Sequence, residues 1–144
     1  MIREYVEKAI ADAGGYTKGV EHTPTMNMGI TQKMLTEYRG SVTSASDLQH
    51  LTLAEAEQIL YELLWSAPGF AGLAAEDSVT KVLFENAVKF GPTESVVLLQ
   101  RALDMPPTGI LVTETKWAVK EEQADVLVAK LHRRVNKLNL RLGK

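Results

Sequence analysis

The stretch that decides the fold is AGGY at residues 13–16, followed after a short gap by NMGIT at residues 27–31. The glycine pair ends a helical pattern, because glycine is a poor helix former, and Thr31 is a good N-cap for the next helix. Residues 13–30 are therefore expected to form a loop that is too long for a simple connector. Loops of this length in a small domain are usually functional or disordered, and this one has room for a short β-hairpin.

Helical periodicity continues on both sides of this loop. Before it, Ile2, Val6 and Ile10 lie at helical spacing and predict a helix from residue 2 to about residue 12. After it, helices are predicted at 31–40, from a capping box at Thr52 to just before Pro68, at 76–90, at 93–103 and at 113–142, with a loop at 41–47. The last segment is expected to form two helices or one bent helix with an inner face of Leu127, Leu131, Val135 and Leu138. The pattern predicts a mainly helical, all-α fold.

Length and composition fit one compact domain. The chain has 144 residues, of which 45% are hydrophobic, and it has no cysteine, so a core forms without disulfides. The formal net charge of −2 gives no electrostatic signal for nucleic-acid binding. The three histidines lack ligand spacing, so neither a metal nor a cofactor is predicted. Without a signal peptide or an apolar run of spanning length, the protein is expected to be made in the cytoplasm.

Together these segments resemble the glycoside hydrolase family 108 muramidases, which occur in phage endolysins and secretion-associated bacterial lysozymes. That family has a Glu directly before Gly-Gly-Tyr, then a polar loop, then Asn-Tyr-Gly-Ile-Thr. The resemblance continues through residues 51–56 with Trp65, residues 83–88 with Gly91-Pro92, and residues 98–103. It implies a single lysozyme-like domain over residues 1–144. Residues 1–90 would be the catalytic-type part, and residues 91–144 a helical part of peptidoglycan-binding type packed in the same core.

Position 13 is where the resemblance places the catalytic general acid, and the residue there is Ala13. Glycoside hydrolysis needs a carboxylic acid to protonate the leaving oxygen, and alanine has no proton to give. The neighbouring Asp12 is rotated by about 100° on a helix, so we do not expect it to substitute. Two interpretations stay open: an engineered Glu→Ala change, which we favour because the surrounding motif is otherwise nearly intact, or a family member that naturally lacks the acid.

Further site residues follow from the resemblance. Glu21 would be the second catalytic carboxylate and Thr25 the water-orienting hydroxyl, with Thr23 inside the alignment error; a solvated loop acid explains Glu21 equally well. The substrate-binding residues would be Tyr16, Asn27, Gly29, Thr31 and Asn86. Tyr16, Asn27 and Asn86 fit a second role equally well, which is to satisfy buried backbone groups. Gly29 also supplies the freedom that a turn needs. Trp65 is expected to pack rather than to stack on a sugar.

The implied function is bacteriolytic peptidoglycan hydrolysis at the β-1,4 bond between N-acetylmuramic acid and N-acetylglucosamine, by a monomer that reaches the cell wall through a holin-type or secretion route. A naturally non-catalytic peptidoglycan-binding module is the alternative, and a helical interaction protein with incidental resemblance is a third interpretation. The basic stretch at residues 130–144 fits a solvated helix face or a weak contact with an anionic envelope surface.

Overall fold

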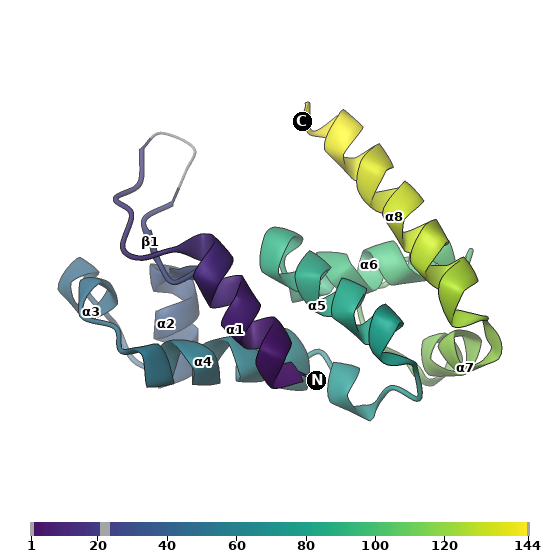
Figure 1. Ribbon diagram of the computed structural model, residues 1–144, viewed down its shortest axis with the longest axis horizontal. Helices are drawn as coiled ribbons and strands as arrows, with labels where there is room; N and C mark the ends of the chain where they lie inside the picture. Colours follow the sequence, from purple (N-terminus) through teal and green to yellow (C-terminus); the bar gives the residue numbers. More distant parts are fainter. Residues whose placement is uncertain (1, 21–23, 144) are drawn as a thin grey trace. The chain divides into compact units, whose positions relative to one another are not determined.

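The computed structural model describes residues 2–20 and 24–143, which form eight α-helices and one two-stranded antiparallel sheet (Figure 1). The predicted mainly helical fold with a short hairpin is confirmed. The chain divides into two compact units, Met1–Leu64 and Trp65–Lys144, and each is described separately below. The assignment of residues 1–144 to one domain with parts 1–90 and 91–144 stays a prediction. Among the described residues, no helix combines the length and apolarity needed to cross a bilayer.

The first unit holds the long loop and the helices around it. Its elements are α1 (Ile2–Ala13), β1 (Met26–Asn27), β2 (Ile30–Thr31), α2 (Gln32–Arg39), α3 (Ala45–Gln49) and α4 (Leu53–Tyr61). Helix α1 packs against α4, and β2 contacts both α2 and α4. Ile30, Leu35, Leu48 and Ile59 are fully buried in the core of this unit. The hairpin thus sits on the core instead of lying in a free loop.

The helix ends of the first unit follow the local capping chemistry. The Thr31 hydroxyl accepts a hydrogen bond from Met34 N at 3.2 Å, and Gly40 ends α2 with φ 71°, as the sequence predicts. The predicted loop at 41–47 is wrong from residue 45 onward, where helix α3 begins. Ser44 and Asp47 form a reciprocal capping box that starts α3, because each side chain satisfies a backbone N–H of the other residue.

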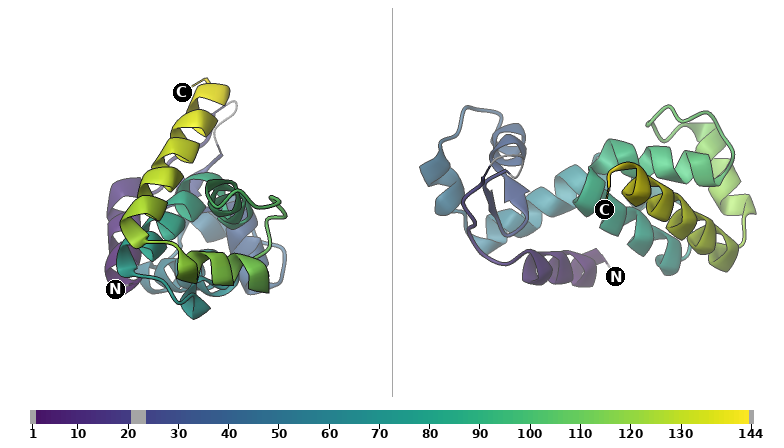
Figure 2. Two further views of the ribbon diagram at one scale, coloured as in Figure 1. Left: turned by 90° about the vertical axis from the view of Figure 1, so that its right-hand side faces the viewer. Right: turned by 90° about the horizontal axis from the view of Figure 1, so that it is seen from above.

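The second unit begins within a π-helical turn, Glu62–Ser66, that continues α4 along the chain. A 3₁₀ turn at Phe70–Gly72 leads to α5 (Asp77–Phe90), α6 (Pro92–Ala102), α7 (Thr113–Glu121) and α8 (Ala124–Arg141). Helices α5 and α6 form a hairpin through Gly91, and α8 packs on both (Figure 2). The Trp65 ring meets Phe70 and Phe84 edge-on, with ring centroids 6.3 and 6.4 Å away. Trp65 therefore packs, as expected.

The last third of the chain forms two helices, which settles the alternative that the sequence left open. The break falls at Glu122 and Gln123, both in extended conformation between α7 and α8. On α8 the side chains of Leu127, Leu131 and Leu138 are buried, whereas Val135 is half-buried. Three of the four predicted inner-face residues are thus core residues.

Candidate functional site

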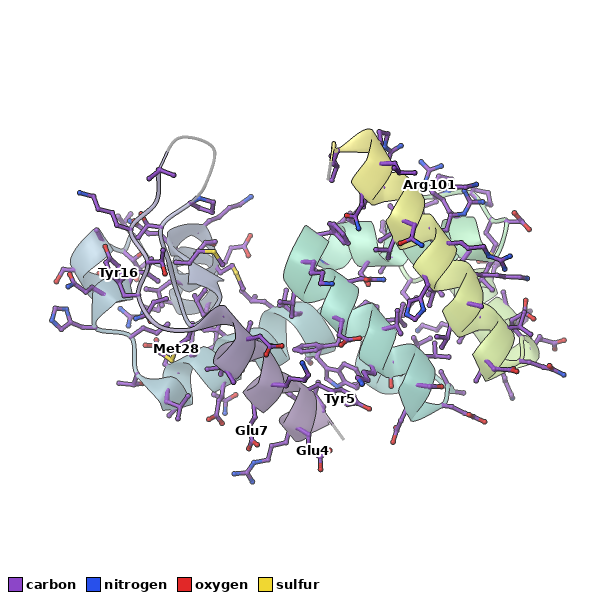
Figure 3. All side chains as sticks on the ribbon, turned by 45° about the horizontal axis from the view of Figure 1, so that its top comes forward. Glu4, Tyr5, Glu7, Tyr16, Met28 and Arg101 are labelled. Atoms are coloured by element: carbon purple, nitrogen blue, oxygen red, sulfur yellow. The ribbon has the colours of Figure 1, made fainter. Side chains whose placement is uncertain are left out.

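The NMGIT motif folds as a tight β-hairpin. Met26 pairs with Thr31 and Asn27 with Ile30, which leaves Met28 and Gly29 as the two turn residues (Met28 is labelled in Figure 3). Both have positive φ, 53° for Met28 and 82° for Gly29. This combination is the type I′ turn, whose twist matches that of the two strands. Thr17 adds a further bridge to Met26, so the chain leaving α1 runs beside the hairpin.

Ala13 lies at the C-terminal end of α1 and its side chain is exposed. The methyl group faces the hairpin turn, because a Cβ added to Gly29 would lie 3.3 Å from Ala13 Cβ. That distance is shorter than an ordinary van der Waals contact. Ala13 and Gly29, which lie 16 positions apart in the sequence, are therefore brought together. The missing side chain of Gly29 leaves space beside position 13.

Asn27 anchors the hairpin to α3. Its side chain is 6% exposed, and its Nδ2 donates to the carbonyl oxygens of Leu48 at 2.9 Å and Gln49 at 3.3 Å. These two carbonyls belong to the last turn of α3, where intrahelical donors run out; that of Leu48 also accepts from Leu51 N at 3.2 Å. Of the two roles that the sequence allows for Asn27, the structure shows the satisfaction of buried backbone groups. Its role as a sugar ligand stays a prediction.

The other predicted site residues of the first unit also surround the hairpin. Tyr16 is 38% exposed and follows the end of α1 (Figure 3). Thr25 Oγ1 accepts a hydrogen bond from Gly19 N at 2.8 Å, which joins the two sides of the loop near the hairpin. Thr31 uses its hydroxyl oxygen to cap α2. Sugar or water contacts of these three residues stay predictions.

Four further candidates named from the sequence are Asp12, Glu21, Thr23 and Asn86. Glu21 and Thr23 lie outside the described residues. Asp12 is exposed, and its carboxylate accepts a hydrogen bond from Lys8 Nζ at 2.8 Å on the preceding turn. This carboxylate is therefore engaged away from the hairpin turn, which fits the expectation that it does not replace the acid. Asn86 belongs to α5 in the second unit. It is 5% exposed, and its Nδ2 has no hydrogen-bond partner within the described part of the chain.

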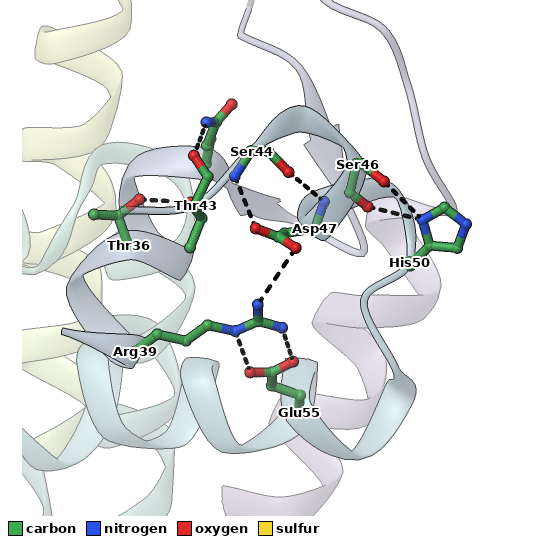
Figure 4. Close-up of polar contacts among 9 residues, drawn as sticks. Thr36, Arg39, Thr43, Ser44, Ser46, Asp47, His50 and Glu55 are labelled. Atoms are coloured by element: carbon green, nitrogen blue, oxygen red, sulfur yellow. Dashed lines mark hydrogen bonds and ion pairs between the residues drawn. The ribbon is translucent and has the colours of Figure 1, made fainter. Parts of the chain in front are cut away.

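An ion-pair cluster joins α2, α3 and α4, the helices around the hairpin (Figure 4). It was not predicted from the sequence. Arg39 at the end of α2 donates to both carboxylate oxygens of Glu55 on α4, at 2.9 and 2.7 Å, and lies 4.0 Å from Asp47 of α3. The Arg39 hydrogen bonds lower the pKa of the Glu55 carboxyl from its usual 4.5. In the sequence, Glu55 follows Thr52 at the spacing of a capping box. That local pattern explains Glu55 without Arg39, so it gives no indication of their contact.

This cluster predicts an acid-dependent loss of stability. Because the folded-state pKa of Glu55 is lowered, its contribution is complete above pH 4.5 and is lost as the pH falls through the folded-state value. We expect the unfolding free-energy difference between this chain and its Glu55→Gln variant to be largest near neutral pH and to vanish in acid. Urea unfolding followed by circular dichroism at several pH values measures it. Glu57→Gln on the same helix is the control, and an equal pH dependence in both variants would argue against the Arg39 contact.

Comparison with known proteins shows which family the chain belongs to. The family model described as glycosyl hydrolase 108 matches residues 5–91. This chain belongs to that family. It is also similar to the solved structure of Brucella abortus SagA, with a TM-score of 0.84 and 26% sequence identity over 94% of this chain and 78% of that chain. No curated protein matches.

Membership of family 108 confirms the resemblance read from the sequence and supports a glycoside hydrolase with peptidoglycan as its substrate class. The matched region contains α1 from Tyr5 to Ala13 and the whole hairpin, and it ends at Gly91. The peptidoglycan-binding assignment of residues 91–144 lies beyond the match and stays a prediction.

Proposed function

We propose that this chain has the scaffold of an endolysin-type N-acetylmuramidase, and that its general-acid position is occupied by Ala13. The reaction supported by this arrangement is hydrolysis of the β-1,4 bond between N-acetylmuramic acid and N-acetylglucosamine. The acid would protonate the leaving oxygen while a second group positions water or stabilises the oxocarbenium-like transition state. The present chain is then inactive or strongly impaired, because the proton donor is absent.

The observation that carries this proposal is the exposed Ala13 methyl group facing Gly29 across the hairpin turn. A glutamate at this position would extend past Gly29, which itself has no side chain to obstruct it. The negative end of the α1 dipole opposes ionisation of a carboxyl group placed there, and any desolvation by a bound glycan would act in the same direction. Both effects keep such a carboxyl protonated closer to neutral pH, which is what a general acid needs.

The surroundings of Ala13 support loss of the acid alone, with the rest of the scaffold retained. The I′ turn, the Asn27 anchor and the Thr31 cap are all formed. An engineered change of a parent glutamate to Ala13 predicts this geometry. Replacement in nature, with the scaffold kept for binding, predicts the same local geometry.

The second candidate function is therefore a peptidoglycan-binding module without catalysis. The observation that favours it is the absence of a free carboxylate beside Gly29 among the described residues: Ala13 has none, and Asp12 is held by Lys8. The two candidates differ in what happens when the acid is restored. A degenerate module has lost other catalytic groups as well, so restoring one carboxylate leaves its turnover at zero.

Product analysis tests the proposal at the level of the bond. Purified peptidoglycan is digested with the Ala13→Glu variant, the products are reduced with borohydride, and the reduced sugar is identified by mass spectrometry. The proposal predicts reduced N-acetylmuramic acid at the new ends. Reduced N-acetylglucosamine would contradict the assigned bond, and retention of the protein on peptidoglycan without new reducing ends would favour the binding module.

We further propose where the protein acts and what its C-terminal part contributes. As a bacteriolytic enzyme of the phage endolysin or secretion-associated type, it would act on the cell wall as a monomer after release by a holin-type or secretion route. Residues 91–144 would add affinity for the glycan strands. Truncating the chain would remove core contacts of α6 and α8 with α5, so this affinity is better measured with the whole chain.

A further inference from the structure

The outward face of α8 combines basic and apolar side chains. Its opposite face buries Leu127, Leu131 and Leu138 in the second unit, where α8 packs on α5 and α6. Arg133, Lys137 and Arg141 follow one another at four-residue spacing, so they form a single stripe along the helix. All three are exposed. This stripe, which we call the α8 stripe, points away from the core of the unit.

The charges of the α8 stripe are uncompensated. Within the described part of the chain no ion pair joins Arg133, Lys137 or Arg141 to an acid, whereas the flanking Lys130 is paired with Glu122 at 3.0 Å and Arg134 lies 4.0 Å from Asp104. The sequence contains no Asp or Glu after Asp125. The free positive charge is therefore concentrated in the last three turns of α8.

Two exposed leucines accompany these charges. Leu140 is 78% exposed and, three residues after Lys137, lies beside it on the helix surface. Leu142 is 52% exposed and is the C-cap residue at the end of α8. The C-terminal end of α8 extends beyond α5 and α6 in two views (Figures 1 and 2). An aqueous surface gains nothing from leucines at such exposure, but a lipid interface accepts both apolar side chains and the charges beside them.

We infer that the α8 stripe, with Leu140 and Leu142, is a docking surface for an anionic phospholipid bilayer. Arginine and lysine would pair with lipid phosphates, and the leucines would enter the region between headgroups and acyl chains. An anionic polymer would use the charges alone, so the exposed leucines favour the lipid surface. Each basic residue near an anionic bilayer is expected to raise the partition coefficient by about fivefold.

Vesicle co-sedimentation with the whole chain tests this inference. The probes are vesicles of phosphatidylglycerol with phosphatidylcholine, and vesicles of phosphatidylcholine alone. The stripe variant is Arg133→Glu with Lys137→Glu. The matched control is Lys116→Glu with Lys120→Glu on α7, which has the same charge change and the same four-residue spacing at exposed positions. Circular dichroism checks that each variant is folded. If the charge reversal disturbs folding, Arg133→Gln with Lys137→Gln replaces it as the stripe variant.

The expected result is binding to the anionic vesicles only, reduced at least about 25-fold in the stripe variant and far less in the control. Leu140→Ser should reduce the binding that remains at high salt. Equal losses in the stripe variant and the control would overturn the inference, since net charge alone would then explain binding. It is also overturned if the chain sediments with purified peptidoglycan but not with vesicles. The assay involves no hydrolysis, so its outcome is independent of position 13.

Discussion

Replacing Ala13 with glutamate is expected to raise peptidoglycan hydrolysis by about 10²–10⁴-fold, the usual contribution of a positioned general acid. The reason is geometric: the side chain at position 13 is exposed at the end of α1 and faces Gly29, so a longer side chain extends beside the hairpin without displacing it. Turbidity loss of permeabilised bacteria gives the rate, and release of reducing ends from purified peptidoglycan confirms that glycan bonds are cut.

Ala13→Gln is the matched control for this prediction. Glutamine has the length and polarity of glutamate but no acidic proton, so it should leave the rate at the level of Ala13. Asp12→Asn in the glutamate background should change the rate little, because the Asp12 carboxylate is engaged by Lys8. Equal rates for the glutamate and glutamine variants would exclude acid catalysis from position 13.

Removing the side chain of Gln100 is expected to cost about 3 kcal/mol of unfolding free energy. This residue of α6 is 1% exposed and holds the loop between α6 and α7. Its Nε2 donates to Ile110 O at 2.9 Å, and its Oε1 accepts from Gly109 N at 2.9 Å. In Gln100→Ala the hydrogen bonds to Gly109 N, Ile110 O and Thr115 Oγ1 are all lost, and each such bond contributes roughly 0.5–1.5 kcal/mol.

Gln100→Glu separates the hydrogen bonds from packing. It keeps the shape and the acceptor for Gly109 N but brings a carboxylate against the carbonyl oxygen of Ile110, so it should also be strongly destabilising. Tryptophan fluorescence during urea unfolding measures the effect in the right place, because both tryptophans, Trp65 and Trp117, belong to the second unit. Arg101→Ala, at the exposed neighbour labelled in Figure 3, should change stability by less than about 0.5 kcal/mol. Losses of equal size at both positions would contradict the assigned role of Gln100.

The helices could be predicted from the sequence wherever their ends depend on local chemistry. Thr31 and Gly40 bound α2 because a threonine hydroxyl and a left-handed glycine satisfy helix ends within a few residues. Helix α3 escaped prediction because it has only five residues, too few for helical periodicity. The capping box of Ser44 and Asp47 was the signal that could have found it.

The hairpin was only weakly predictable because its turn residues are atypical. A type I′ turn favours Asn-Gly or Asp-Gly, whereas here Met28 adopts φ 53° before Gly29. The contact of Arg39 with Glu55 could not be predicted at all, since the two residues lie 16 positions apart and local patterns carry no information on such pairs. The assignment of position 13 as the general-acid position was inferred from the family resemblance. The proximity of Ala13 to Gly29 is visible only in the structure.

The most direct test of the account is whether glycan binds beside residue 13. A soluble muropeptide with at least two disaccharide units can be titrated into the isotopically labelled chain without being cut, because Ala13 supplies no acid. We expect the amide signals of Gly14, Tyr16 and Gly29 to shift together with one dissociation constant. Binding that leaves these signals unchanged, or shifts only residues of the second unit, would contradict it.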